Sequence, residues 1–308
     1  MILYKTNDGW FADIGHLFTS WTIRRIVRWT LFAAAYSTLV TWGLLEVEVM
    51  RRAQVDATVY TLLGLVLSIL LVFRTNTAYD RWWEGRKQWG ALVNNCRNLA
   101  VYIHGAFPVD DQEVRRFAGK QIANFCLAFV EHLRDGTRLD DLIYLNPEER
   151  ARFARANHVP NLIVRRLYGR LSDAHARGEI SNADFINIGP LHKSLLDILG
   201  ACERIKKTPI PFSYAVYLKL FITCYVLILP FALAGVFGWL TVGVSMIVTF
   251  ALVGVELLGE EIEDPFGRDC NDLPTGDIAH AIKKNVFEIL EDRYTVEEGD
   301  RELYEKVF

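Results

Sequence analysis

The sequence predicts an all-α integral membrane protein with four transmembrane helices per subunit and a cytoplasmic helical layer. Of its 308 residues, 51% are apolar and 23% are charged, so residues of the two kinds must be segregated along the chain. Uncharged runs that suit membrane helices are separated by charged stretches with helical periodicity. No segment shows the strict alternation of apolar and polar residues that indicates a strand.

The first two predicted spans cover residues 26–45 and 57–73. The second has no charged side chain, and the charged stretch after it contains no proline until Pro108. Because nothing breaks the helical pattern where the charges begin, we expect one long helix that starts in the membrane and ends in water.

The last two predicted spans come from the uncharged run between Leu220 and Val255, which is too long for one helix. We expect spans at residues 213–235 and 238–258. The chain should reverse or kink at Pro230 or at Gly235–Gly238, because proline and glycine interrupt helices.

Residues 74–212 and 259–308 have the composition of a helical layer in water. Asn146, which precedes Pro147, and Ser181 are predicted N-caps, because their side chains accept hydrogen bonds from the first helical turn. We expect Val159–Asn161 to interrupt the pattern. Gly189–Pro190 should bend or break the helix that begins at Ser181.

Basic residues indicate the orientation in the membrane. They flank the first two spans and precede the third, at Arg24, Arg25, Arg28, Arg74, Arg81, Arg86, Lys87, Lys206 and Lys207. The positive-inside rule therefore predicts that both termini and the helical layer lie in the cytoplasm. We expect the spans to lie in the inner membrane of the cell. Arg51 and Arg52 in the outer loop weaken this bias without reversing it.

Composition and motifs argue against several other functions. The net charge is −3 and no basic block is present, so we expect no nucleic-acid partner. The five cysteines lack CxxC spacing, which indicates reduced thiols, and residues 1–20 lack the pattern of a cleaved signal peptide. The seven histidines are scattered along the sequence and form no metal-binding motif, so we expect surface or capping side chains. No sequence motif of an enzyme active site is present, so we expect no enzymatic activity.

One stripe stands out in the second span. Leu65, Ile69 and Phe73 recur every four residues, which places them along one face of a helix. Such a stripe can face lipid, the core of the subunit or a pore, and spacing alone does not decide among these.

Three segments in the same order resemble the bestrophin family, in particular its prokaryotic and chloroplast branches. They are FRTNTAYDRWWEGRKQWG at Phe73–Gly90, ACERIKKTPIPFSYAVYL at Ala201–Leu218 and GEEIEDPFGRDCNDLP at Gly259–Pro274. The resemblance implies one channel unit over residues 1–308, assembled as a homopentamer around an axial pore. It places the narrow apolar neck of that pore at Leu65, Ile69 and Phe73. It also implies a cytoplasmic aperture, for which Ile188 and Leu191 are candidates, although each could equally belong to the core.

The third segment is an acidic turn. Its acids, which we expect after a helix C-terminus, need a positive partner because the helix dipole disfavours negative charge there. In animal bestrophins this turn is a calcium clasp, and the resemblance makes Glu261, Asp264, Asp269 and Asp272 candidate calcium ligands. Cys270, Asn271 and Arg268 depart from that acidic run, so a turn held by salt bridges to neighbouring Arg and Lys residues is the favoured alternative.

The sequence therefore predicts a passive channel for monovalent ions, embedded among membrane lipids. Calcium is its one candidate cofactor. Resemblance to the prokaryotic branch favours sodium or other monovalent cations. A chloride channel of the same fold and a non-conducting membrane sensor are the alternatives. An uncharged neck gates by excluding water and cannot itself select the sign of the ion.

Overall fold

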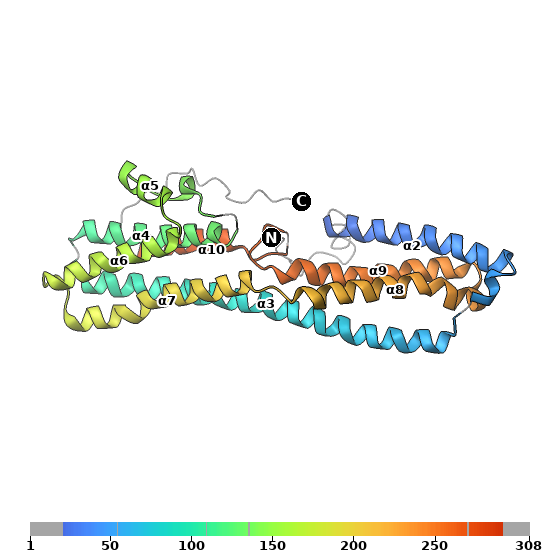
Figure 1. Cartoon of the computed structure of the whole chain (residues 1–308). Helices are drawn as coiled ribbons and strands as arrows, with labels where there is room; N and C mark the ends of the chain where they lie inside the picture. Colours follow the sequence, from blue (N-terminus) through green and yellow to red (C-terminus); the bar gives the residue numbers. More distant parts are fainter. Residues whose placement is uncertain (1–20, 54, 109, 135, 270, 292–308) are drawn as a thin grey trace.

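The structure, a computed structural model, describes residues 21–53, 55–108, 110–134, 136–269 and 271–291. All regular secondary structure within these ranges is helical, and the helices form an elongated molecule (Figure 1). Its longest element is α3, Ala57–Ala106, whose 50 residues extend for about 75 Å. The N-terminal part of α3 belongs to one half of the molecule and its C-terminal part to the other (Figure 1). The expected helix that continues without interruption is confirmed.

The first half combines the start of α3 with α2 (Trp21–Glu46), α8 (Phe212–Phe237) and α9 (Leu240–Glu263). A short 3-10 helix, Met50–Ala53, follows α2. The helix α2 lies along α9, and α9 also packs against α3 and α8 (Figure 1). Among the described residues, α3, α8 and α9 are long and apolar enough to cross a membrane.

The second half is the helical layer expected from the charged stretches. It contains the end of α3, α4 (Gln112–His132), η2 (Leu139–Asp141), α5 (Pro147–Ala154), α6 (Val159–Ala176), α7 (Asn182–Lys207) and α10 (Thr275–Ile289). Its core lies where α3, α4, α7 and α10 meet, and Trp89 of α3 stacks on Phe129 of α4 with ring centroids 5.1 Å apart. Burial of these rings fixes the far end of α3 in this half.

The local helix signals act as expected at the starts of α5 and α7. Asn146 Oδ1 accepts the Glu149 backbone N–H at 2.7 Å, and the Glu149 carboxylate accepts the Asn146 N–H, which forms a capping box for α5. Ser181 caps α7 by accepting the Asp184 N–H. The predicted interruption at Val159–Asn161 is the first turn of α6, where Pro160 occupies a position that needs no N–H donor.

Proline breaks neither of the helices in which it was expected to do so. Pro190 lies inside α7, where burial of Ile188 and Leu195 on either side offsets the lost hydrogen bond. Pro230 likewise lies inside α8, which continues to Phe237. The chain reverses at Gly238, inside the expected region, with φ of +52°, a conformation that favours glycine.

Candidate functional site

The predicted neck residues share an exposed face of α3. Leu65, Ile69 and Phe73 are 60%, 49% and 61% exposed, whereas the opposite face of the same turns is buried at Leu67 and Leu71 against α8. The stripe therefore does not belong to the core of the subunit. Its surface is available to a pore, to a neighbouring subunit or to lipid.

Directly after the stripe, Arg74 ties α3 to the end of α9. Its side chain is almost fully buried, and Nη2 lies 2.8 Å from Oε2 of Glu263. Nε lies 3.6 Å from Oε2 of Glu256, whose two oxygens are also buried. Glu263 uses its other oxygen to accept the backbone N–H of Ile210 at 2.8 Å. A buried cation between two carboxylates fixes the axial position of α3 against α9.

Two turns further along α3, Arg81 caps two helices at once. Its Nη1 and Nη2 donate to the carbonyl oxygens of Thr208 and Ile205 at 2.5 and 2.6 Å, at the end of α7. Its Nε donates to the carbonyl oxygen of Glu263 at 3.1 Å, at the end of α9. A guanidinium at two helix C-termini satisfies carbonyls that lack helical partners and offsets both dipoles.

The acidic turn begins differently from the expectation. Glu260, Glu261 and Glu263 lie in the last turn of α9, not after it, because no breaker precedes Pro265. Glu261 accepts hydrogen bonds from Thr22 Oγ1 at 2.6 Å and from Asn271 Nδ2 at 3.0 Å.

Beyond the helix, Asp264 pairs with Nζ of Lys206 at 2.5 Å. The turn then packs against α3 at Gly85, where a Cβ would come within 3.1 Å of both Phe266 and Pro265. Basic side chains from α3 and α7 thus supply the positive charge that this helix end requires.

Asp269 and Asp272 close the turn. Asp272 is buried, and its Oδ2 accepts the backbone N–H of Asp269 at 2.6 Å, while Oδ1 is buried without a hydrogen-bond partner. Burial raises the pKa of Asp272 to about 7 and also raises that of Asp269, which is the more exposed of the two.

The four candidate calcium ligands lie close enough to interact electrostatically, but among the described residues no three of their ligand atoms come within 4.8 Å of one another. There, three or more ligand atoms from His, Cys, Asp or Glu come within 4.8 Å of one another only at a different place, which is described below. The turn makes internal hydrogen bonds and ion pairs, and calcium as a ligand of its acids stays a prediction.

The aperture candidates lie on α7 with different exposure. Ile188 is only 1% exposed and belongs to the core of its own subunit, which is the alternative that the sequence left open for this residue. Leu191 is partly buried against the same core. The exposed apolar side chain in this part of α7 is Ile186.

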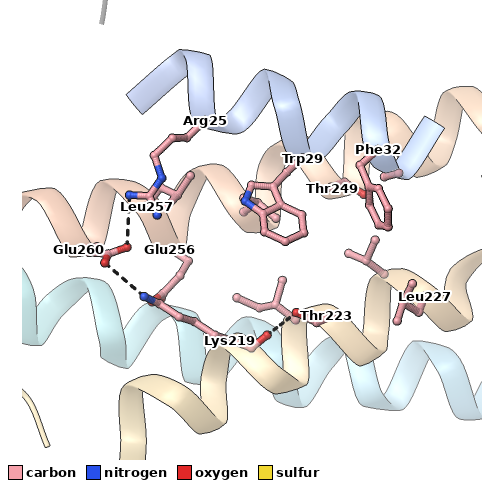
Figure 2. A pocket seen from close by; sticks show the side chains of 14 residues that line it. Arg25, Trp29, Phe32, Lys219, Thr223, Leu227, Thr249, Glu256, Leu257 and Glu260 are labelled. Carbon is pink, nitrogen blue, oxygen red and sulfur yellow. Dashed lines mark hydrogen bonds and ion pairs between the residues drawn. The ribbon is translucent and has the colours of Figure 1, made fainter. Parts of the chain in front are cut away.

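A crevice of about 160 Å³ opens between α2, α8 and α9 (Figure 2). Trp29 and Phe32 of α2 lie along its apolar part, opposite Leu227 of α8 (Figure 2). At its other end Glu260 lies 3.2 Å from Nζ of Lys219 and 3.9 Å from Nη1 of Arg25. One carboxylate thus links the three helices at the end that adjoins the second half of the molecule.

The structure also brings together two histidines that the sequence separates. His132 and His158 both contact Oε1 of Glu203, through their Nε2 atoms at 2.6 and 2.9 Å. Partial burial opposes ionisation of Glu203, but these two contacts and Lys207 outweigh it and lower its pKa to about 2. His158 is a capping side chain as expected, but the expectation did not include its proximity to His132 at a shared carboxylate. No sequence signal could have found it, since the three residues come from different helices.

Comparisons with known proteins agree with this architecture. The family described as bacterial/fungal bestrophin protein matches residues 1–288. The voltage-dependent anion channel-forming protein alr2987 of Nostoc is 35% identical over 275 residues, which cover 85% of this chain and 89% of that protein. The voltage-dependent anion channel-forming protein YneE of Escherichia coli K12 is 33% identical over 232 residues, 75% of each chain.

Among solved structures, a bacterial bestrophin homologue from Klebsiella pneumoniae superposes with a TM-score of 0.82. It is 26% identical and the match covers 87% of this chain and all of that one. The helical fold, with its apolar helices and long central α3, is thus that of a bestrophin-type membrane protein. The chain belongs to the bacterial/fungal bestrophin family.

Proposed function

We propose that this chain is a subunit of an ion channel and that α3 lines the pore. The observation that carries the proposal is the exposed stripe at Leu65, Ile69 and Phe73, on a helix whose opposite face packs against α8. Relatives that share about a third of their residues with this chain are named as channel-forming proteins, not enzymes, which supports the same class.

The channel is a homopentamer with four spans per subunit, as the family resemblance implies. α2 supplies the fourth span, because it lies against α8 and α9 and is as long as α8 at 26 residues. Its three arginines lie near the end that adjoins the second half, where basic side chains can reach the interface. We therefore place the second half and both termini in the cytoplasm, with the spans in the cell inner membrane and lipids around them.

The neck acts as a gate that excludes water. Three rings of apolar side chains offer a permeating ion no polar partner, so conduction requires the neck to widen and hydrate. Because none of the three side chains is charged, selection between anions and cations occurs elsewhere along the pore.

We assign monovalent anions, with chloride as the test ion, as the permeant class. The names of the relatives in Nostoc and Escherichia coli support anions over the sodium that the prokaryotic resemblance had favoured. Recording from purified protein in planar bilayers under an asymmetric NaCl gradient tests this assignment. A reversal potential near the chloride equilibrium potential is expected, and one near the sodium potential would establish the cation alternative.

The gate has a separate test. Replacing Leu65, Ile69 and Phe73 together by Ala should raise conductance several-fold with the oligomer intact, because a wider neck hydrates more readily. The matched control is Leu240, Ile247 and Phe250 of α9, the same three residue types at exposed positions, changed together to Ala. Equal currents from the two triple variants would refute the assignment of Leu65, Ile69 and Phe73 to the neck. Absence of current from every form would favour the sensor.

Two finer assignments stay predictions. If calcium binds the acidic turn, the current should change when calcium is chelated. If salt bridges hold the turn, chelation should leave the current unchanged. A cytoplasmic aperture on α7 is better sought at exposed Ile186, with partly buried Leu191 as the remaining original candidate.

A further inference from the structure

The cluster formed by His132, His158 and Glu203 has the composition and geometry of a metal site. His132 is the last residue of α4, His158 is the N-cap of α6, and Glu203 lies near the end of α7. Both imidazoles direct Nε2 at the same carboxylate oxygen, and the ring centroids are 4.2 Å apart. All three ligand atoms lie within 4.8 Å of one another.

We propose that these three side chains bind a late first-row divalent cation of the zinc class. Two imidazoles and one carboxylate suit Zn²⁺ and its neighbours, whereas Ca²⁺ and Mg²⁺ prefer sites made of oxygen atoms. This assignment does not depend on the proposed channel activity.

The distances are close to those of an occupied site. Tetrahedral zinc holds nitrogen and oxygen ligands at about 2.0–2.2 Å, which separates neighbouring ligand atoms by roughly 3.4 Å. The Nε2–Oε1 distances of 2.6 and 2.9 Å therefore need to lengthen by only about 0.5–0.8 Å to admit the ion. Rotation of side chains on three fixed helices can supply that change without a shift of the backbone.

The ion also has a route of access and an open position. The side chains of His132, Glu203 and His158 are 18%, 21% and 28% exposed, so the cluster opens to solvent. Three protein ligands leave the fourth tetrahedral position to water.

Two contacts oppose binding and limit its affinity. Nζ of Lys207 lies 3.4 Å from Oε2 of Glu203 and partly neutralises the carboxylate. Nδ1 of His158 accepts the backbone N–H of Asn161 at 3.3 Å, which places the proton of the neutral ring on Nε2. Binding through Nε2 moves that proton to Nδ1 and gives up this long hydrogen bond.

A bound ion would join the end of α4, the start of α6 and the end of α7. The carbonyl oxygens of Ile205 and Thr208, just beyond Glu203, are the ones that Arg81 of α3 holds. Metal binding would therefore stiffen the part of the helical layer closest to the membrane half.

The test uses the purified full chain, stripped with a chelator and titrated with Co²⁺ and separately with Zn²⁺. We expect the visible ligand-field absorption of four-coordinate Co²⁺, its displacement by Zn²⁺ and one retained Zn²⁺ per chain. Glu203→Gln and His132→Gln should each weaken Zn²⁺ binding at least tenfold. His175→Gln, on α6 and outside the cluster, should leave it unchanged.

The wild-type titration keeps the proposal falsifiable even if a variant fails to fold. Lack of Co²⁺ absorption, or less than a tenth of a Zn²⁺ retained per wild-type chain, would overturn it. So would equal Zn²⁺ affinity in wild type and in a folded Glu203→Gln variant.

Discussion

The ion pairs around Arg74 give the sharpest test of how α3 is held against α9. Changing Arg74 to Met keeps much of the side-chain volume but leaves Glu256 and Glu263 without their shared cation. Breaking a buried pair in this way costs about 3–5 kcal/mol, because a charge stays buried without compensation. Glu263 keeps its hydrogen bond from Ile210, so most of the cost should fall on Glu256.

The measurement is the free energy of unfolding in detergent micelles, followed by tryptophan fluorescence during denaturant titration. The double variant Arg74→Met/Glu256→Gln removes the stranded charge and should recover more than half of the loss. Lys193→Met is the control, because the Lys193–Asp197 pair is exposed on both sides and should contribute within about 0.5 kcal/mol. A loss below about 1 kcal/mol for Arg74→Met, or a double variant less stable than the single one, would refute the reasoning.

Two further predictions concern other parts of the fold. Burial alone would raise the pKa of Glu149, but hydrogen bonds from Lys120 and the Asn146 N–H lower this pKa below the ordinary value of 4.5. The ionised Glu149 therefore stabilises the fold fully above pH 4.5, and this stabilisation is lost as the pH falls through the lowered pKa of the folded state. The stability gap between wild type and Glu149→Gln should therefore be largest near pH 7 and shrink below pH 4.5; a constant gap would contradict this. Gly238→Ala should destabilise the protein by about 1–2 kcal/mol, because φ of Gly238 is +52°. Gly200→Ala, inside α7 and with open space at its Cβ position, is the control and should be neutral or stabilising. Equal unfolding midpoints for the two variants would contradict the argument from backbone strain.

The helices could be predicted from the sequence because their signals are local. Asn146 and Ser181 cap the helices they were expected to cap, and the uncharged run after Leu220 divides into α8 and α9 near Gly238. Pro190 shows the limit of such signals. Its effect on α7 depends on the burial of Ile188 and Leu195, which a local pattern does not contain.

The candidate sites also differ in how far local sequence signals could predict them. The shared face of Leu65, Ile69 and Phe73 follows from helical spacing alone, and the structure adds that this face is exposed. The histidine cluster depends on how α4, α6 and α7 pack, so no spacing in the sequence could indicate it. The sequence likewise left Ile188 either in the core or at an aperture, and packing places it in the core.

The exposed face of α3 also bears on ion selectivity. Below the neck the same face continues through Asn76, Asp80, Lys87 and Asn94, all of them exposed. In a symmetric oligomer Asp80 would form an acidic ring about 10 Å below Phe73, and Lys87 a basic ring about 10 Å further on. Glu84, 2.6 Å from Nζ of Lys87, weakens the basic ring.

Rings of opposite charge on one helix face mean that the sign of the permeant ion is not a property of the α3 sequence. It depends on which ring lies where the pore is narrow and poorly hydrated, because a charge acts most strongly where water screens it least. The acidic ring is closer to the neck and favours cations, while the names of the relatives favour anions. The reversal potential decides between them, and an anion channel would require the field of Lys87 and other basic side chains to dominate beyond the neck.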